Sequence, residues 1–467
     1  MTENDADPQL DPAALDAARF DPAVMYLPTP DDAEAAHDVA HWALARLAGR
    51  RDILPRRQPD GPLQPLGRTG IGAAAALEAF RDRVAPTAMP PDHPRFLAFI
   101  PGAHTVAAAL TDMALSAAMI YGGDFLEGGR AVEAEEAVAR WLADLAGYPA
   151  AAGGTFVSGG SIANLSALVA ARGGGPEAHR RRVILAGASA HSSMAAAAHI
   201  MGCKLVTAPA ADAHGRLDAP TLERALAPLD SREVVAVVAT AGATNTGAFD
   251  DIAGVADVCA AHDLRLHVDG AYGGAALLSP RTRPLLKGIE RTDSFIVDPH
   301  KMLYSTFDCA ALVYRDCRAA CGALTQTADY LDVVCETGGG SPNPSDLAIH
   351  LTRRARGVPV WASVLAYGTD AYAAAVDHCV DITEYAAERI AASPMLEAAI
   401  EPAFTVILMR RLGWSAGDYA AWSEQAMARG VGVVLPTKLA GETLLRLCFV
   451  NPLTTRDDVD LVLADLA

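Results

Sequence analysis

The sequence has no uninterrupted run of the roughly eighteen apolar residues that a membrane-spanning helix needs. The longest candidate, residues 106–121, is interrupted by Asp112. Its eight cysteines are scattered, and no two form a Cys-x-x-Cys pair. In a chain of 467 residues this pattern argues against a disulfide framework and against a zinc ribbon. We therefore expect no transmembrane segment, no metal site and reduced thiols.

Positive charge is also scarce. The chain has 38 Lys and Arg against 56 Asp and Glu, which gives a formal net charge of −18. Its arginine clusters are short, such as those at 180–182 and 353–354. Such a chain repels phosphate backbones and anionic lipid, so we expect neither nucleic acid nor a membrane as a partner. The first residues, MTENDADPQLD, are acidic where a secretory signal peptide is basic, which favours a cytoplasmic protein.

Apolar residues are plentiful, at 51% of the chain, and they follow a pattern. Residues 31–47 have helical periodicity. From about residue 150, short apolar runs alternate with helical stretches. The runs are TFVSGG, RVILAGAS, CKLVTAP, EVVAVVATAG, LRLHVDGA, SFIVDPH and CAALVYRD. Because they are apolar throughout rather than alternating, they predict strands covered on both faces, in a large α/β domain with a mostly parallel sheet.

The C-terminal part of the chain has a different pattern. A helical stretch follows Trp361 and ends near Ser393. Two strand-like runs come next, FTVILMRR and ETLLRLCFV, with the helical SAGDYAAWSEQAMARG between them. We interpret this part as a smaller α+β domain.

Three segments carry groups suited to chemistry at the carboxyl ends of strands, where open parallel sheets bind their ligands. HVDGAYGGA places Asp269 at a strand end, and SFIVDPHK places Lys301 just after another. FVSGGSIANLSAL combines a strand, the glycines 159 and 160, and a helix start at Ser161, which can cradle a phosphate. Singly, these features are an ordinary surface lysine, a helix cap and a turn. Together they supply the amine, carboxylate and anion cradle that hold pyridoxal phosphate (PLP).

At this point the sequence resembles a family, the group II PLP-dependent amino-acid decarboxylases of fold type I. The segments SGGSIANL, ASAHSS, ATAGATNTGAFDDI, HVDGAYGG and DPHK appear in family order, and the resemblance runs from HPRFLAFIPG at residue 93 to the C-terminus. It implies a large domain with a seven-stranded, mostly parallel sheet and a small C-terminal α+β domain. The boundaries that we expect are an N-terminal helical segment 1–90, a PLP-binding domain 91–355 and a small domain 356–467. The resemblance also implies a homodimer with active sites at the interface.

The resemblance assigns roles residue by residue. Lys301 matches the lysine that forms the Schiff base with PLP, and Asp269 the partner of the pyridine nitrogen. His191 matches the histidine stacked on the ring, and Ala271 the small residue under its other face. Thr244 matches a threonine near the cofactor. The positions that line the phosphate are matched by Gly160, Ser161, Asp298 and His300. The alternatives are a capping or buried histidine for His191 and an ordinary loop hydroxyl for Thr244.

Tyr330 bears on which reaction the enzyme catalyses. It matches a mobile-loop tyrosine that is thought to return a proton to Cα after CO₂ leaves, whereas relatives with Phe at this position resemble oxidative aldehyde synthases. A packing role is the alternative. Phe99, Ile100 and Arg354 match substrate positions, and the apolar pair favours an aromatic or aliphatic substrate, although core packing also explains that pair.

The resemblance predicts a PLP-dependent L-amino-acid α-decarboxylase that releases CO₂ and an amine. Three other reactions on the same scaffold stay open: oxidative aldehyde synthesis, transamination and C–C lysis. A non-catalytic PLP-binding homologue is a further alternative. The sequence does not name the amino acid.

Overall fold

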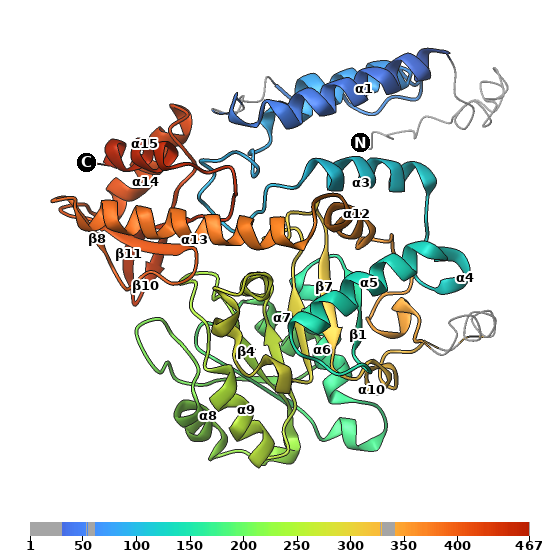
Figure 1. The fold of residues 1–467 in the computed structure, drawn as a ribbon, viewed down its shortest axis with the longest axis vertical. Helices are drawn as coiled ribbons and strands as arrows, with labels where there is room; N and C mark the ends of the chain where they lie inside the picture. Colours follow the sequence, from blue (N-terminus) through green and yellow to red (C-terminus); the bar gives the residue numbers. More distant parts are fainter. Residues whose placement is uncertain (1–29, 53, 55–60, 327, 329–340, 467) are drawn as a thin grey trace, which may run out of the picture. The chain divides into compact units, whose positions relative to one another are not determined.

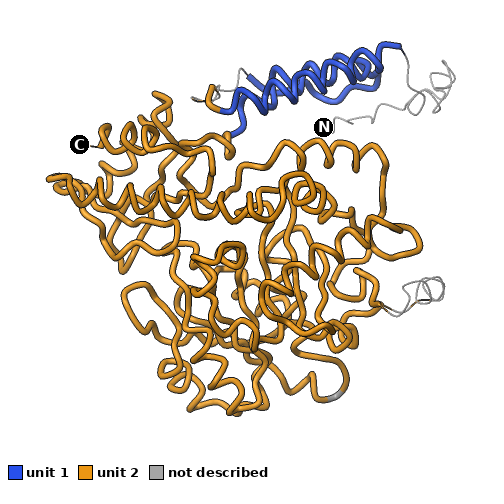
Figure 2. The backbone as a smooth tube through the Cα atoms, viewed as in Figure 1, with its two compact units in different colours: residues 1–50, 56–89 blue, residues 51–55, 90–467 orange. Residues whose placement is uncertain are grey.

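The structure is a computed structural model that describes residues 30–466, except for residues 53, 55–60, 327 and 329–340. The chain divides into two compact units (Figure 2). The smaller comprises residues 1–50 and 56–89, and the larger comprises residues 51–55 and 90–467.

The smaller unit is helical. Its two α-helices are α1 (Pro30–Ala48) and α2 (Ala73–Ala79), and α2 continues through a π turn and a 3-10 turn to Thr87. α1 coincides with the helix predicted over 31–47. It begins at a proline and has two aspartates in its first turn, both of which favour a helix N-terminus.

The larger unit contains the predicted seven-stranded sheet (Figure 1). Its strands are β1 (Gly153–Val157), β2 (Val183–Ala186), β3 (Lys204–Thr207), β4 (Val234–Thr240), β5 (Leu266–Asp269), β6 (Ser294–Val297) and β7 (Ala310–Tyr314). Six of them fall within one of the seven apolar runs, and β1 begins two residues before the run TFVSGG. Their order in the sheet is β1-β7-β6-β5-β4-β2-β3.

The directions of these strands create the edge at which ligands can bind. β3, β2, β4, β5 and β6 are parallel, and β7 is antiparallel to both of its neighbours, β6 and β1. β1 therefore runs in the same direction as β6. The carboxyl ends of all strands except β7 consequently meet at one edge of the sheet.

Helices cover both faces of this sheet, which explains why its strands are apolar throughout. On one face lie α6 (Gly160–Arg172), α7 (Ser193–Ile200) and α10 (Cys317–Cys321). On the other lie α5 (Arg130–Leu145), α8 (Ala219–Leu226), α9 (Ile252–Ala261) and α12 (Val358–Tyr367). Two further helices precede α5, namely α3 (Val106–Ala118) and α4 (Phe125–Gly128).

The C-terminal region forms a second, antiparallel sheet with the order β10-β11-β9-β8. Its elements are α13 (Thr369–Ala391), β8 (Leu396–Ala398), β9 (Val406–Arg411), α14 (Ala416–Ala428), β10 (Leu435–Leu439), β11 (Glu442–Cys448) and α15 (Arg456–Leu466). The three helices and this sheet share a hydrophobic core of their own. The predicted α/β class with a small C-terminal α+β region is confirmed.

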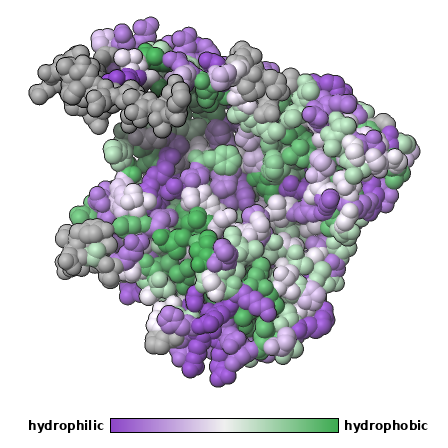
Figure 3. Space-filling model, turned by 180° about the vertical axis from the view of Figure 1, so that it is seen from behind, coloured by the Kyte–Doolittle hydropathy of each residue, from purple (hydrophilic) through white to green (hydrophobic). Residues whose placement is uncertain are grey.

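Apolar side chains also reach the surface, where apolar patches lie among hydrophilic residues (Figure 3). None of the helices in the described ranges combines the length and the apolar character that crossing a membrane requires.

Candidate active site

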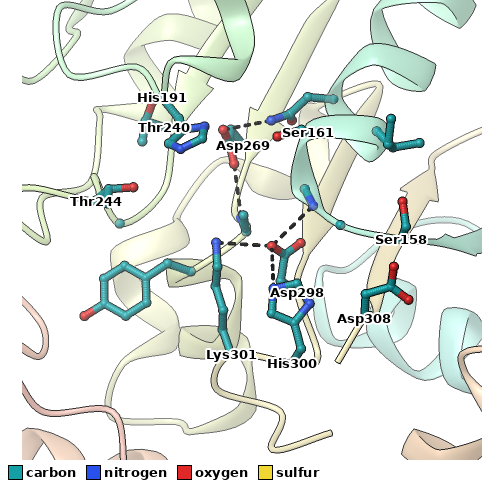
Figure 4. A pocket seen from close by; sticks show the side chains of 17 residues that line it. Ser158, Ser161, His191, Thr240, Thr244, Asp269, Asp298, His300, Lys301 and Asp308 are labelled. Carbon is teal, nitrogen blue, oxygen red and sulfur yellow. Dashed lines mark hydrogen bonds and ion pairs between the residues drawn. The ribbon is translucent and has the colours of Figure 1, made fainter. Parts of the chain in front are cut away.

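The predicted chemical groups meet in a cavity of about 370 Å³ at the carboxyl edge of the large sheet (Figure 4). Its wall is formed by the segments that follow β1 and β6 and by the last residues of β4 and β5. The volume lies within the range of small-molecule sites. The cavity brings together Lys301, Asp269, His191, Thr244, Ala271, Gly160, Ser161, Asp298 and His300, as the sequence predicts.

Asp298 organises the segment after β6. Its Oδ2 lies 3.1 Å from the Nζ of Lys301 and 3.5 Å from the Nε2 of His300, and it accepts a hydrogen bond of 3.3 Å from the Gly160 N–H. His300 accepts the Cys309 N–H at Nδ1, so its Nε2 carries the proton that faces Asp298. Burial lowers the pKa of His300, against the opposing effect of the Asp298 charge. The Asp298 carboxylate therefore contacts the amine of Lys301, the imidazole of His300 and the N-terminus of α6.

Asp269, the last residue of β5, is buried at the base of the cavity. It accepts hydrogen bonds from the Asn164 side-chain amide at 3.0 Å and from the Ala271 N–H at 3.2 Å. Both partners are hydrogen-bond donors, so together they fix the position of the carboxylate. Asp269 thus presents a fixed negative group to the cavity.

The N-terminus of α6 faces the same cavity; its N-cap residue, Gly159, has no side chain to cap it, and the Gly160 N–H donates to Asp298. The unpaired N–H groups of a first helical turn attract an anion. A Cβ on Gly160 would lie 3.0 Å from Asp298 Oδ2 and 3.1 Å from the Ala271 Cβ, so glycine allows the close approach of this turn to the β6 segment. This turn could hold an anion, and its role as a phosphate cradle stays a prediction.

His191 and Thr244 come from two loops on the far side of the cavity from Asp298 (Figure 4). The side chain of His191 is exposed, and its Nδ1 lies 3.0 Å from the Ser193 hydroxyl. Thr244 is exposed as well. Both side chains can therefore reach a ligand in the cavity.

Four predicted residues are not among those that line this cavity. Ile100 is 6% exposed and packs in the main hydrophobic core, whereas Phe99 is 57% exposed. Arg354 forms an ion pair with Asp112 of α3. Tyr330 lies outside the described residues. The substrate roles of the first three stay predictions.

The cavity also contains residues that the sequence analysis missed. Asn164 is buried on α6, and Thr240 ends β4 with a buried hydroxyl that has no hydrogen-bond partner in the described part of the chain. Nothing local distinguishes either from an ordinary core residue. Gly102 lies against the backbone of Lys301, where a Cβ would come within 1.6 Å of the lysine carbonyl oxygen. Gly102 is the last residue of HPRFLAFIPG, the segment where the family resemblance begins, and that position was the one indication in the sequence that it could matter.

Comparisons with known proteins agree on one family. Residues 73–412 match the pyridoxal-dependent decarboxylase conserved domain. L-2,4-diaminobutyrate decarboxylase of Rhizobium meliloti is 34% identical over 411 residues, covering 86% of this chain and 83% of that protein. Aromatic-L-amino-acid decarboxylase of Bacillus atrophaeus is 29% identical over 384 residues, covering 79% of each chain.

Solved structures have the same fold. A crystal structure of Oryza sativa TDC with PLP and tryptamine superposes with a TM-score of 0.85 at 24% identity, covering 96% of this chain and 99% of that one. The glutamate decarboxylase domain of a Vibrio parahaemolyticus protein, described as a diaminobutyrate-pyruvate transaminase and L-2,4-diaminobutyrate decarboxylase, gives a TM-score of 0.75 at 26% identity, covering 86% of each chain.

Proposed function

The chain belongs to the pyridoxal-dependent decarboxylase family, and on that premise we propose that it is an L-amino-acid α-decarboxylase that releases CO₂ and an amine. It is an enzyme of the amino-acid decarboxylase class, and its cofactor is PLP. The observation that carries the proposal is one cavity that joins an amine, Lys301, to a buried carboxylate, Asp269, and to the N-terminus of α6.

The polar groups of the cavity fit PLP. The N-terminus of α6 suits a phosphate, and Asp269 suits a protonated ring nitrogen. Asp298 Oδ1 and Thr240 Oγ1 are buried and have no hydrogen-bond partner in the described part of the chain. Both oxygens are therefore available to form hydrogen bonds with a ligand in the cavity.

In our proposal Lys301 carries the cofactor, Asp269 pairs with the ring nitrogen, and His191 and Ala271 face the two sides of the ring. Thr244 lies near the cofactor, and the residues around its phosphate are Gly160, Ser161, Asp298 and His300. Asp298 has a further role in this arrangement. A carboxylate repels a phosphate, so its contribution is to hold Lys301 and His300 in place.

When bound, PLP supplies an electron-withdrawing ring that stabilises the negative charge left on Cα as CO₂ departs. The protein must keep the ring nitrogen protonated, and the fixed carboxylate of Asp269 does this by favouring a positive charge beside it. Apolar Ala271 and the imidazole of His191 would keep water away from the two faces of the ring.

Tyr330 completes the proposal as the acid that returns a proton to Cα. A phenol can supply that proton and a phenyl ring cannot. We therefore expect Tyr330→Phe to lower amine formation at least about a hundredfold, the usual order of a general-acid contribution, while PLP still binds. Amine formation within twofold of the wild-type rate would show that another group is the acid.

The decisive experiment is a product assay. Purified enzyme with PLP is incubated with single L-amino acids, and CO₂, amine, aldehyde, peroxide and keto acid are measured. Equal amounts of CO₂ and amine are expected. Aldehyde with peroxide, or a keto acid without CO₂, would overturn the decarboxylase proposal and favour the other PLP reactions. A protein that binds PLP and converts no amino acid would be a non-catalytic homologue.

For the substrate we propose an aromatic or aliphatic L-amino acid, on the apolar character of Phe99 and Ile100 in the family's substrate positions, although neither lines the cavity and Ile100 packs in the core. The relatives suggest which amino acids to compare. The two described above give L-2,4-diaminobutyrate and the aromatic amino acids, and a cysteine sulfinic acid decarboxylase of Mus musculus, 30% identical over 367 residues, adds cysteine sulfinate. The amino acid that gives the highest kcat/KM is assigned as the substrate. A preference for diaminobutyrate or cysteine sulfinate would overturn the aromatic or aliphatic assignment without affecting the reaction type.

We also propose that the enzyme is a homodimer. Helices α3 and α12 pack together, and both have outward apolar side chains. The exposed set is Val106, Leu110, Met113, Trp361, Leu365 and Tyr367. We call these six residues the α3/α12 patch. A contiguous exposed apolar patch is typical of a protein interface. The division into domains 1–90, 91–355 and 356–467 and the cytoplasmic location also stay predictions.

A further inference from the structure

The side chain of Asn164 joins two groups that face the cavity from different elements. Its Nδ2 donates to Asp269 Oδ2 at 3.0 Å and to the Ser193 hydroxyl at 3.2 Å. Ser193 in turn contacts His191 Nδ1 at 3.0 Å. One amide on α6 is therefore linked to the proposed partner of the ring nitrogen and to the residue proposed to stack on the ring.

The other end of the same amide is also engaged. Asn164 Oδ1 lies 2.9 Å from His267 Nε2, and His267 Nδ1 lies 2.8 Å from the Ser294 hydroxyl. Asn164, Ser193, His267, Asp269 and Ser294 are all buried. Together with His191 we call them the Asn164 network.

The direction of each hydrogen bond in the network follows from Asp269. A carboxylate only accepts, so the Asn164 NH₂ must face it and the amide oxygen must face His267. His267 then donates from Nε2 and accepts the Ser294 hydroxyl proton at Nδ1, which is one neutral tautomer. Both N–H groups of the amide and its oxygen are used, so the amide has one satisfied orientation.

His267 suits this role because it stays uncharged. Burial lowers the pKa of His267 to about 4, against the opposing effect of Asp269. At neutral pH the network therefore needs no second charge beside the carboxylate.

The strands place these side chains. His267 and Asp269 are two residues apart on β5, so they point to the same face of the sheet, and His267 is paired with Ser294 across β5 and β6. Asn164 lies on α6 about one turn beyond Gly160, over that face. The same helix thus provides both the phosphate cradle and the amide that holds Asp269.

We propose that Asn164 is a positioning residue that acts through Asp269, and that His267 fixes the orientation of its amide. This inference rests on the proposed function, in which Asp269 pairs with the ring nitrogen of PLP. Because hydrogen bonds to a buried carboxylate are strong, the network sets how firmly the ring is held and protonated.

The first test measures the dissociation constant of PLP and the absorbance spectrum of the bound cofactor. Asn164→Asp keeps the size of the side chain but replaces its donors with a second carboxylate. We expect PLP binding to weaken at least about tenfold, the order for a lost charged hydrogen bond, with a changed ratio of visible to near-ultraviolet absorbance. Ser166→Ala is the matched control, because buried Ser166 lies on the same helix and, among the described residues, accepts a hydrogen bond from the Ile349 N–H rather than from the Asn164 network. Wild-type affinity and spectrum in Asn164→Asp would overturn the proposal.

A second pair of variants separates positioning from packing. Glutamine can place an amide N–H where the imidazole Nε2 lies, whereas leucine cannot. We expect His267→Gln to keep an affinity for PLP within about threefold of the wild type, and His267→Leu to lose tenfold or more. Equal losses in both variants, in protein whose circular dichroism matches the wild type, would overturn the role of His267.

Asp269→Asn, measured in parallel, separates the proposed role of Asn164 from the proposed pairing of Asp269 with the ring nitrogen. If it weakens PLP binding while Asn164→Asp does not, only the inference about Asn164 is wrong. If Asp269→Asn leaves PLP binding and the spectrum unchanged, the proposed pairing of Asp269 with the ring nitrogen is wrong, and the inference falls with it.

Discussion

Lys301 illustrates how a residue whose role is predicted from its motif still depends on distant parts of the chain. The DPHK motif assigns the lysine, but its amine is held by the Asp298 carboxylate, and its backbone is covered by Gly102. The carboxylate is three residues away and was visible in the motif. The glycine is far away in sequence, and its contact depends on tertiary structure.

The lysine assignment is tested by Lys301→Ala. Without the amine no covalent bond to the cofactor can form, so the visible absorbance band of lysine-bound PLP should be absent and amine production should fall below detection. Lys287→Ala is the matched control, because Lys287 is exposed and lies outside the cavity. If the band persists in Lys301→Ala, another lysine carries the cofactor.

His267 also predicts a pH dependence of stability. Its pKa is about 4 in the folded protein and about 6.5 in the unfolded chain. The unfolded chain therefore binds more protons between these values, and the contribution of the neutral histidine is complete above about pH 6.5 and lost towards pH 4. Buried Asp250, whose pKa burial raises to about 7, acts in the opposite direction over part of this range.

The comparison of wild type with His267→Gln isolates the histidine, because glutamine does not titrate and Asp250 is common to both. Between pH 7 and pH 5 the wild type should lose about 2 kcal/mol of unfolding free energy relative to the variant. Reversible urea unfolding of the apoenzyme measures this difference. An equal difference at both pH values would mean that His267 titrates alike in the folded and unfolded chains.

Among the elements, the large sheet was predictable because its central strands are buried on both faces and form apolar runs, and the partly exposed edge strands β1 and β3 lie next to such runs in the same alternating pattern. The small sheet was only half predictable. β8 is three residues long, and β10 contains Pro436 and Lys438 and is not fully buried at any position, so neither has an apolar run. The single helical stretch predicted after Trp361 is two helices, α12 and α13, because Gly368 separates them at φ 77°.

Asn164 shows why the site could be predicted only in part. Its segment, SIANLSAL, has the pattern of a buried helix, and an amide in such a helix has no local signature. What gives it a role is the pairing of β5 with β6 beneath it, which only the folded sheet provides.

A prediction at the scale of elements concerns the segment before α3. Gly102 donates to the His300 carbonyl at 3.1 Å, and Thr105 donates to the Tyr304 carbonyl at 2.9 Å, so this segment is fastened to the turn that carries Lys301. A Cβ on Gly102 would force the two backbones apart. Gly102→Ala should cost about 1–3 kcal/mol of stability, as overpacking does, and weaken PLP binding about tenfold or more.

Gly322→Ala is the control for that substitution. Gly322 has ordinary helical dihedrals, and no atom lies within 4 Å of the position of its Cβ. Thermal unfolding and PLP titration of both variants make the comparison. Wild-type behaviour of Gly102→Ala would show that the two segments can separate without disturbing the lysine.

For the whole molecule, the prediction concerns assembly. Leu365 is 70% exposed in the α3/α12 patch, and Leu461, on α15, is 45% exposed outside it. A charge placed in a buried interface is costly, so Leu365→Asp should convert the dimer to a monomer, whereas Leu461→Asp should stay dimeric. Light scattering coupled to size-exclusion chromatography gives the masses. A monomeric wild-type protein would overturn the homodimer.

The antiparallel strand β7 has a consequence for how the chain is made. In the described part of the chain, β1 pairs only with β7, and the residues joined in this way, such as Gly153 and Tyr314, are about 160 positions apart. A ribosome adding about 5–20 residues per second needs on the order of ten seconds to cross that interval. Until then β1, together with the cradle at the start of α6, has no neighbour in the sheet. The enzyme therefore cannot complete this part of its cofactor site before β7 has been synthesised, and until then the nascent chain carries an unpaired apolar strand.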